Sequence, residues 1–580
     1  MIRRILIYFF LASLVSIGVL LIIKFYNTLS EKKNDISAYI TEKTDIIIRF
    51  NKPFEKVKIL NSNSLLWKNA TENIILKQLN NYILMSDSLV LKQPILKAIT
   101  QTEELILCIS NISDESFSWL LLSNSAQDLS EDEFKKCIQD YKLSYHSNRE
   151  YKKNMIHKLT KDHHEFYAMT NRNILIASSS ESLIERSITG YNQNKILPAL
   201  NNDAFANIII TNSDFSIANI TLKNIVANYI YEFSNESNFD VYFEANILRL
   251  NGYTDYSNTN FFQEQDFSLK KYIVDKCQWF YTFSVKDINN IVRNRLSLVK
   301  DKIYILEVNS TLSELNTKYS CDIENDILSW IDADILLMNF ENKQDDTTSK
   351  IILFKTQNYQ QALQELKKLS IKTDSIPNKK EFFLGLEINK IYLPDVFKTL
   401  FGEIFNMPDN VCYSVIDDAI VFSSSAAVLF DYINELINEN YLYRDLLFDK
   451  LYSENYSDKI SSMFYLNDKK SIEILNHNSL FPKNIINAIS SFSWQTTGIK
   501  NNKVFSQYIY SFNFTNNDLI KQGDLWTYKL QSDLLNEPYI VYNHISQSSN
   551  VFVQDQEYNI YLISSTGELL WKKQLEDKII

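Results

Sequence analysis

An uncharged apolar run near the N-terminus constrains this chain more than any other feature of its sequence. The run extends from Ile5 to Ile23. At ~1.5 Å of rise per residue, about 19 helical residues cross the ~30 Å hydrocarbon core of a bilayer. The rest of the chain has the composition of an ordinary hydrophilic protein. We therefore predict a single membrane anchor that carries one large body.

We expect the anchor to be retained, with a cleaved signal peptide as the alternative. A signal peptide has a shorter apolar region of ~7–15 residues and a small-x-small cleavage site, which does not follow this run. Arg3 and Arg4 favour a cytoplasmic N-terminus, although Lys24, Lys32 and Lys33 lie on the other flank. The predicted location is the inner membrane, with a single pass and the C-terminal body in the periplasm.

The overall composition limits the classes of partner and cofactor. The chain has 580 residues, a net charge of -11 and 45% hydrophobic residues, which suits several domains with real cores. The acidic balance argues against a nucleic-acid partner, because phosphate binding needs clustered Lys and Arg. Gly and Pro number only 8 each, and neither GxGxxG nor GxxxxGK[ST] occurs. We therefore expect no nucleotide cofactor.

The cysteines do not form a recognisable framework. They are five in number and scattered singly, without a CxxC pair, so neither a zinc site nor a disulfide scaffold is indicated. We expect most to be small buried apolar residues, although one pair could bridge in an oxidising compartment. They are Cys108, Cys137, Cys277, Cys321 and Cys412.

Expected elements recur along the chain in one order. A strand at 45–50, followed by a helix capped by Asn51, resembles the strand at 279–285 with the helix start after it. Later strands, a serine triplet and a helix then follow in the same sequence in both halves. This order predicts two copies of an α+β module of roughly 230–240 residues. The other matched segments are 105–109 and 334–340, 117–122 and 350–355, 174–191 and 419–437, 208–210 and 463–466, and 240–253 and 492–512.

The predicted fold class is therefore α+β, with mainly antiparallel sheets and an N-terminal transmembrane helix. The tail adds four short strands separated by polar turns, which indicates a β-meander. The expected parts are an anchor (1–24), a stalk (25–41), module 1 (42–270), module 2 (275–515), a linker (516–536) and the meander (537–580).

The meander resembles a β-propeller repeat of the quinoprotein-dehydrogenase type. The strand at 560–563, Gly567 in the turn and Trp571 in the next strand carry this resemblance over about 40 residues. Propellers need ~4–8 blades, so the resemblance implies a partial propeller, apparently truncated, or a blade that docks on the body. No quinone-binding residue carries over.

The duplicated body resembles bacterial membrane-anchored envelope proteins of domain-of-unknown-function family 3352. The residues that carry this resemblance lie at 45–57, 326–335 and 413–425. The resemblance would span most of residues 40–515. The family has no established activity, so the resemblance implies a place in the envelope but no functional residue.

Three groups of residues could carry chemistry, and the first is a histidine cluster. His157, His163 and His164 lie close together in the sequence. Their spacing differs from the HxxxH pattern of a helical zinc site, and His157 alternates with apolar residues as in a strand. We predict a solvated hairpin here and no metal site.

The second group is two serine triplets, at 178–180 and 423–425, each in a strand-to-helix turn. A nucleophile elbow needs glycine on both sides of the serine, and none is present. His477 and His544 have no context of a catalytic triad. Helix capping explains the serines, and Ser182 with Glu185 fits a capping box.

The third group is the carboxylate pairs Asp332 with Asp334 and Asp417 with Asp418. They could serve acid–base chemistry or Ca²⁺, but no DxDxDG loop occurs. Asp417 and Asp418 separate two apolar runs, which is typical of a hairpin turn. Asp345 and Asp346 fall in a polar loop. We therefore expect no catalytic, cofactor-binding or metal-binding residues.

The sequence thus predicts a non-catalytic, membrane-anchored binding or scaffold protein with a protein partner in the envelope. One alternative is an envelope hydrolase whose site is assembled between the two modules. Another is a quinoprotein-like propeller sensor. The oligomeric state does not follow from the sequence.

Overall fold

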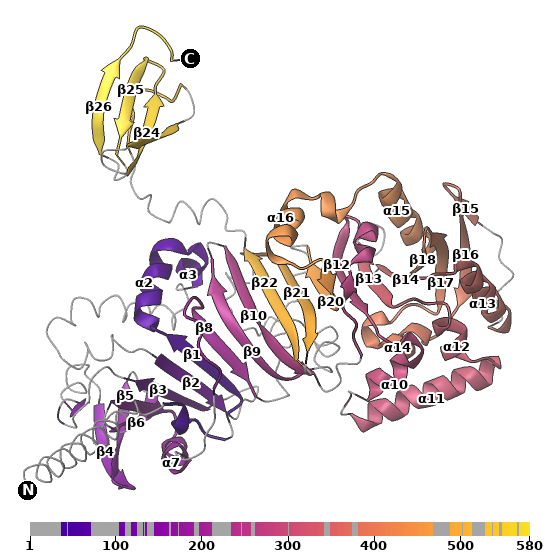
Figure 1. Ribbon diagram of the computed structural model, residues 1–580, viewed down its shortest axis with the longest axis horizontal. Coiled ribbons are helices and arrows are strands. Elements are labelled where there is room, and N and C mark those ends of the chain that lie inside the picture. Colours follow the sequence, from indigo (N-terminus) through magenta and orange to yellow (C-terminus); the bar gives the residue numbers. More distant parts are fainter. Residues whose placement is uncertain are drawn as a thin grey trace, which may run out of the picture. The chain divides into compact units, whose positions relative to one another are not determined.

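The structure analysed is a computed structural model of the 580-residue chain (Figure 1). It describes residues 36–42, 44–70, 104–110, 118–124, 132, 134–135, 144–161, 164–171, 173–190, 197–211, 234–244, 246–256, 261–297, 299, 301–340, 349–373, 381–467, 488–500, 503–512, 528–535, 538–543, 548–564 and 568–579. The chain divides into two compact units, Met1–Phe512 and Asn513–Ile580.

The first half of unit 1 contributes ten antiparallel strands to a sheet. They lie side by side in the order β4-β5-β6-β7-β3-β2-β1-β8-β9-β10. Apolar β-branched runs such as that of β1 favour strands because branched side chains pack well on a pleated surface. The strands are β1 (Ile46–Asn51), β2 (Glu104–Ser110), β3 (Ser118–Asn124), β4 (Ser144–Tyr151), β5 (Asn154–Lys161), β6 (His164–Asn171), β7 (Ile174–Ser178), β8 (Ala206–Ile210), β9 (Ser234–Phe243) and β10 (Ile247–Tyr256).

The second half of unit 1 builds the same arrangement from ten further strands. Their order is β15-β16-β17-β18-β14-β13-β12-β20-β21-β22, again antiparallel throughout. They are β12 (Cys277–Ser284), β13 (Asp334–Phe340), β14 (Ser349–Lys355), β15 (Glu381–Phe383), β16 (Leu386–Tyr392), β17 (Asn410–Ile416), β18 (Ala419–Ser423), β20 (Ser462–Leu466), β21 (Ile489–Lys500) and β22 (Lys503–Phe512).

Strands β10 and β22 join the two halves into one continuous sheet (Figure 1). They occupy the same place in their respective halves, and they pair antiparallel from Ile247 opposite Ser511 to Asp255 opposite Lys503. Equivalent strands that pair antiparallel are related as in a two-fold interface, where the same surface serves both partners. The order of strands is therefore mirrored across this junction.

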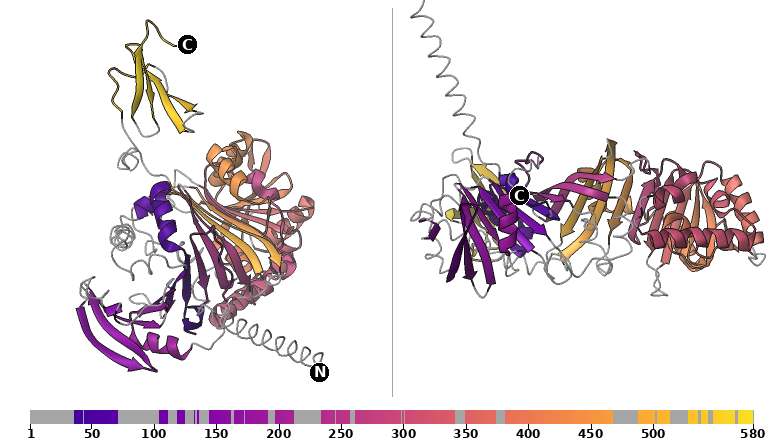
Figure 2. Two further views of the ribbon diagram at one scale, coloured as in Figure 1. Left: turned by 60° about the vertical axis from the view of Figure 1, so that its left-hand side comes forward. Right: turned by 90° about the horizontal axis from the view of Figure 1, so that it is seen from below.

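Helices pack on the sheet in corresponding places in the two halves. Two further views show helices beside the strands of the sheet (Figure 2). Helix α7 (Glu181–Thr189) lies against β6 and β7, and α15 (Ala426–Ile437) lies against β14, β17 and β18. Each covers an apolar core. The other helices among the described residues of unit 1 are η1 (Ile36–Tyr39), α2 (Pro53–Asn63), α3 (Leu65–Ala70), η2 (Ser268–Tyr272), η3 (Ile288–Asn290), α10 (Ile291–Leu296), α11 (Lys302–Tyr319), α12 (Ile323–Leu328), α13 (Tyr359–Lys372), α14 (Val396–Phe401), η4 (Glu403–Phe405), η5 (Leu442–Arg444) and α16 (Leu446–Asn455).

A two-stranded sheet lies beside the second half. It pairs β11 (Gln265–Asp266) with β19 (Lys459–Ile460). Strand β11 belongs to the segment 261–267, which precedes η2 and leads from the first half into the second.

Unit 2 is a four-stranded antiparallel meander, as the sequence predicts. It comprises β23 (Tyr539–Asn543), β24 (Ser548–Gln554), β25 (Asn559–Ile563) and β26 (Leu569–Gln574). Tyr528 and Leu530, which fall in the predicted linker, pack against the small core of Val553, Tyr561 and Ile563. The buried Asp555 carboxylate accepts a 2.6 Å hydrogen bond from the Tyr561 hydroxyl.

The predicted fold class is confirmed as α+β with mainly antiparallel sheets. Ile5–Ile23 lies outside the described residues, and no helix among those described is long and apolar enough to cross a membrane. Cys108, Cys277 and Cys412 are buried, as predicted, whereas Cys321 is partly exposed and Cys137 lies outside the described residues.

The predicted cap of α2 is wrong in detail. Asn51 ends strand β1, and Lys52, with a left-handed backbone (φ 45°), precedes Pro53 as the N-cap residue. Proline at the first helical position is favoured because its missing N–H has no partner there anyway. The strand pairing of Asn51 with Glu104 therefore outcompetes the local capping preference.

Candidate functional site

His157, one residue of the predicted cluster, is part of the core, so the prediction of a solvated hairpin is wrong for this side chain. His157 in β5 is fully buried, and its ring lies 5.2 Å from the Phe134 ring and 5.8 Å from the Tyr145 ring. His163 lies outside the described residues, and His164 begins β6. Within the described part of the chain, no three His, Cys, Asp or Glu residues are placed to hold a metal ion.

The two serine triplets differ in how they cap the helices that follow them. Ser425 caps α15, because its Oγ accepts a hydrogen bond from the Val428 amide at 3.3 Å, as predicted. Ser180 precedes α7 without a side-chain cap bond. The predicted capping box of Ser182 and Glu185 is wrong, since the Glu185 carboxylate pairs with Arg149 of β4 instead. Tertiary pairing between two elements has replaced a local cap.

The predicted turn at Asp417 and Asp418 is confirmed. Both residues connect β17 to β18, and Asp417 has a left-handed backbone with φ 52°. Asp418 accepts hydrogen bonds from the Tyr272 hydroxyl and, at 3.2 Å, from Lys271 Nζ. Burial alone would raise the pKa of the Asp418 carboxyl, but these two donors outweigh it and lower that pKa. The hydrogen bonds from Tyr272 and Lys271 to Asp418 thus connect η2 to the β17–β18 hairpin.

We expect Tyr272→Phe to lower the free energy of unfolding by about 1 kcal/mol at pH 7, near the lower end for a hydrogen bond to a charged group, because Asp418 is half exposed. The pKa of Asp418 is lowered in the folded state, so its contribution is complete above ~3.9, the ordinary Asp pKa, and is lost as pH falls through the folded value. Denaturant titrations between pH 7 and pH 3 should show the difference from the native chain shrinking. In an Asp418→Asn background the same change should have little pH dependence. With Asp418 present, a stability difference that stays constant between pH 7 and pH 3 would refute this assignment.

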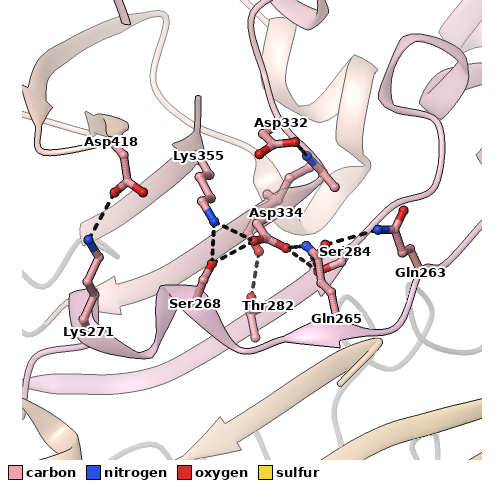
Figure 3. A network of polar contacts seen from close by, with 12 residues as sticks. Gln263, Gln265, Ser268, Lys271, Thr282, Ser284, Asp332, Asp334, Lys355 and Asp418 are labelled. Carbon is pink, nitrogen blue, oxygen red and sulfur yellow. Dashed lines mark hydrogen bonds and ion pairs between the residues drawn. The ribbon is translucent and has the colours of Figure 1, made fainter. Parts of the chain in front are cut away.

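A network of polar contacts surrounds Asp334, the first residue of β13 (Figure 3). The buried carboxylate accepts hydrogen bonds from Ser284 Oγ, from Gln265 Nε2 and, at 2.9 Å, from Ser268 Oγ. Lys355 Nζ lies 3.7 Å from Asp334 Oδ2 and donates to Ser268 Oγ at 3.1 Å. The carboxylate therefore ties β12, β14 and the segment that contains β11 to the start of β13.

We call this network the Asp334 brace. Both oxygens of the Asp334 carboxylate accept from donors of the chain itself, so the network has a structural role. The neighbouring Asp332 does not join it, since its Oδ1 accepts from the following Ala333 amide at 2.9 Å. The carboxylates predicted as a possible pair thus serve separate local roles, while Asp345 and Asp346 lie outside the described residues. A buried carboxylate needs several donors because desolvation of a charge is costly.

In the first half, the carboxylate at the position equivalent to Asp334 has different hydrogen-bond partners. Glu104, the first residue of β2, lies opposite Asn51 as Asp334 lies opposite Ser284. Its carboxylate accepts a 2.8 Å hydrogen bond from Arg49 Nε, and Arg49 Nη1 donates to Pro198 O at 2.6 Å. Among the described residues the donor to Glu104 is therefore Arg49 of β1, and the chain before β8 contributes only an acceptor, Pro198 O.

A groove with a volume of about 600 Å³ opens beside this place. Its walls are the end of β1 with helix α2, the loop before β8 and the end of β9. The lining residues are Asn51, Lys52, Glu55, Lys56, Ile59, Leu60, Asn202, Asp203, Phe205, Tyr242, Phe243 and Glu244. A cavity of this size falls in the range of small-ligand sites.

The floor of the groove is aromatic. The rings of Phe205 and Phe243 meet edge to face at a centroid distance of 5.1 Å. Behind them lies the buried Trp67 of α3, 5.5 Å from Phe205 and 5.7 Å from Phe243. Ile59 on the α2 wall is 50% exposed, so apolar surface faces the opening as well as the floor.

The charged groups of the rim are largely compensated within the chain. Lys52 Nζ lies 3.9 Å from Glu55 Oε2, and Glu244 forms a 2.6 Å ion pair with Arg249. Lys56 Nζ donates to Ala204 O, and burial lowers the pKa of Lys56 against the opposing pull of the nearby acids. The groove thus combines an apolar floor with charged groups that are largely paired within the chain.

The rim also contains a bridge between two asparagines. Asn51 Nδ2 donates to Asn202 Oδ1 at 2.8 Å, which connects the end of β1 to the loop before β8. On the far wall, the Tyr242 hydroxyl accepts a 2.8 Å hydrogen bond from Asn201. None of the groove residues belongs to the three groups singled out from the sequence.

Comparison with known protein families, with curated proteins and with solved structures finds no match to this chain.

Proposed function

We propose that this chain is a membrane-anchored, extracytoplasmic binding protein of a bacterial envelope, held in the inner membrane by Ile5–Ile23. The observation that carries the binding role is the groove in the first half of unit 1. It offers an aromatic floor and internally compensated charges, which are features of recognition sites. In this proposal the protein binds and does not transform its ligand.

The repeated strand order supports an origin by internal duplication. Equivalent strands β10 and β22 form the junction, so the two halves are arranged as two subunits of a symmetric dimer would be. The alternative hydrolase would need a site between the halves, whereas the groove lies within the first half. The meander of unit 2, in this proposal a single propeller-like blade, would serve contact with an envelope partner.

We expect ligand-observed NMR with a library of neutral and charged fragments to reveal compounds that compete for one site on the full chain. Ile59→Trp, which fills the groove from the α2 wall, should abolish their signals. Ile371→Trp is the matched control, because Ile371 is 70% exposed on α13 and does not line the groove. The bound compounds should remain chemically unchanged.

Fragments that bind the Ile59→Trp chain equally well, or that are converted to products, would refute the binding role. The location is checked on the same proteins in cells. A phosphatase that is active only outside the cytoplasm, fused after residue 580, should be active. An inactive fusion, at equal protein level, would contradict the extracytoplasmic placement.

A further inference from the structure

The position in the second half of unit 1 that corresponds to the groove is occupied by a segment of the chain itself. Segment 261–267 lies between the end of β12 and the start of β19. On one side the Gln263 amide donates to Ser284 O at 2.9 Å, and Phe262 forms a β-bridge with Val285. On the other side β11 pairs with β19. The segment thus enters as an added strand.

Strand registers show that the two places correspond. Phe50 pairs with Ala206 in the first half as Phe283 pairs with Ser462 in the second. The residues beyond these pairs are therefore equivalent. In the first half they are Asn51 and the 202–205 loop, which line the groove and are joined by the hydrogen bond from Asn51 Nδ2 to Asn202 Oδ1.

The filled place shows what kind of occupant this fold accepts. Phe261 and Phe262 are buried; Phe261 stacks on Phe283 at a ring-centroid distance of 6.4 Å, and Phe262 meets Phe283 edge to face at 6.2 Å. The backbone of the segment makes the strand contacts, and its aromatic side chains cover apolar surface. A peptide strand with alternate side chains in pockets is a general mode of recognition.

We propose that the groove of the first half binds an extended polypeptide segment of a partner protein, with adjacent aromatic residues that cover Phe205 and Phe243. This inference rests on the binding role proposed above and names its ligand class. The segment would enter between Asn51 and Asn202 and would replace the hydrogen bond between their side chains. Its aromatic rings would contact the floor and Ile59.

The chain's own residues before η1 are the competing occupant. The sequence Tyr39-Ile40-Thr41-Glu42-Lys43 matches Tyr272-Ile273-Val274-Asp275-Lys276, and each follows or ends a short 3₁₀ helix. By this match residues 28–34 correspond to 261–267. They contain one large apolar side chain, Leu29, where 261–267 has three phenylalanines. An aromatic floor is better matched by an aromatic partner.

The test uses the full chain in detergent micelles and fluorescein-labelled peptides, with binding followed by fluorescence anisotropy. The probe peptide has the sequence of residues 260–268, NFFQEQDFS, and a second peptide has that of residues 27–35, NTLSEKKND. We expect the probe to bind saturably. Replacing both of its adjacent phenylalanines with alanine should weaken binding at least tenfold.

The site is assigned with variants of the full chain. Ile59→Trp in α2 and Asn202→Arg in the loop before β8 should each weaken binding of the probe at least tenfold, while Ile371→Trp should leave it unchanged. Circular dichroism of each variant establishes that it is folded. Two wall variants are used so that a folding defect in one leaves the other informative.

Three results would overturn the inference. The probe could fail to bind, it could bind both wall variants as tightly as the native chain, or the 27–35 peptide could bind the groove as tightly as the probe. The last result would assign the groove to the chain's own residues. If small fragments bind the groove and both peptides fail, the proposed binding role stands and the peptide assignment is wrong.

Discussion

Gly252→Ala is expected to lower the free energy of unfolding of unit 1 by about 3 kcal/mol, the upper end for overpacking in a well-packed region. Gly252 lies in β10, between Phe239 of β9 and Ser506 of β22. A Cβ atom at this position would lie 2.7 Å from Phe239 Cα and 2.8 Å from the Asn238 carbonyl carbon. These neighbours are backbone atoms, so they move only if the strand pairing moves.

The effect should be strongest at the junction of the two halves. Hydrogen–deuterium exchange should show faster exchange in β9, β10 and β22 than in the native chain, while denaturant titration gives the size of the change. Because β10 and β22 are the strands that connect the halves, a shift of β10 weakens both pairings at once.

Gly385→Ala serves as the control for loss of a glycine without a clash. Gly385 has φ 88°, and an added Cβ would meet no atom within 4 Å. Its cost should be about 1 kcal/mol, from backbone strain alone. If both alanine variants lose the same stability, or if exchange in β9 and β22 is unchanged, close packing at Gly252 does not hold the junction.

The sequence predicts strands better than it predicts how they are joined. The aromatic and β-branched run of β12 has no competing local preference, and the expected strand at 279–285 matches it closely. The turn at Asp417 is also predictable, because short polar residues between two apolar runs favour a hairpin. The pairing of β10 with β22 is a contact between distant residues, on which local patterns carry no information.

Local capping signals fail where a distant partner competes. Glu185 fits a capping box in the sequence, yet Arg149, which belongs to another hairpin, binds it. Asn51 fits an N-cap, yet β2 pairs with it. In both cases the competing interaction appears only after the sheet has formed, so the sequence alone cannot weigh it.

The groove could not have been predicted, because no motif marks it. Its residues come from three segments that the fold brings together: 51–60, 202–205 and 242–244. Phe205 and Phe243 individually look like ordinary core residues. The duplication offers one usable signal, since aligned halves would show aromatic residues in 261–267 without equivalents at 28–34.

Asp334→Asn is expected to lower the free energy of unfolding by about 3 kcal/mol, the lower end for breaking a buried ion pair by removing one partner. The change keeps the shape but replaces one acceptor oxygen with an amide donor. That donor would face Ser284, Ser268 or Gln265, which already donate to this site (Figure 3). Lys355 would lose its counter-charge, although its partial exposure limits this part of the cost.

Asp332→Asn is the matched control, two residues away. Asp332 accepts a hydrogen bond from the adjacent Ala333 amide, and an asparagine oxygen can do the same. We expect a change within about 0.5 kcal/mol, as for substitutions away from a buried network. Equal losses in the two variants, measured by denaturant titration, would show that the Asp334 network is not a brace.

The part of the chain that Asp334→Asn should destabilise connects this network to the binding proposal. Gln265 and Ser268 bind Asp334 from either side of the end of segment 261–267, so the carboxylate fixes the strand that fills the second half. Asp334→Asn should therefore increase hydrogen exchange in 261–268 more than in β16 or β17. In the first half Arg49 of β1 donates to Glu104 instead, and the residues that the structure describes there place no equivalent strand in the groove. Unchanged exchange in 261–268 would show that the Asp334 network does not hold the segment in place. The network would then not explain why this place is filled in the second half.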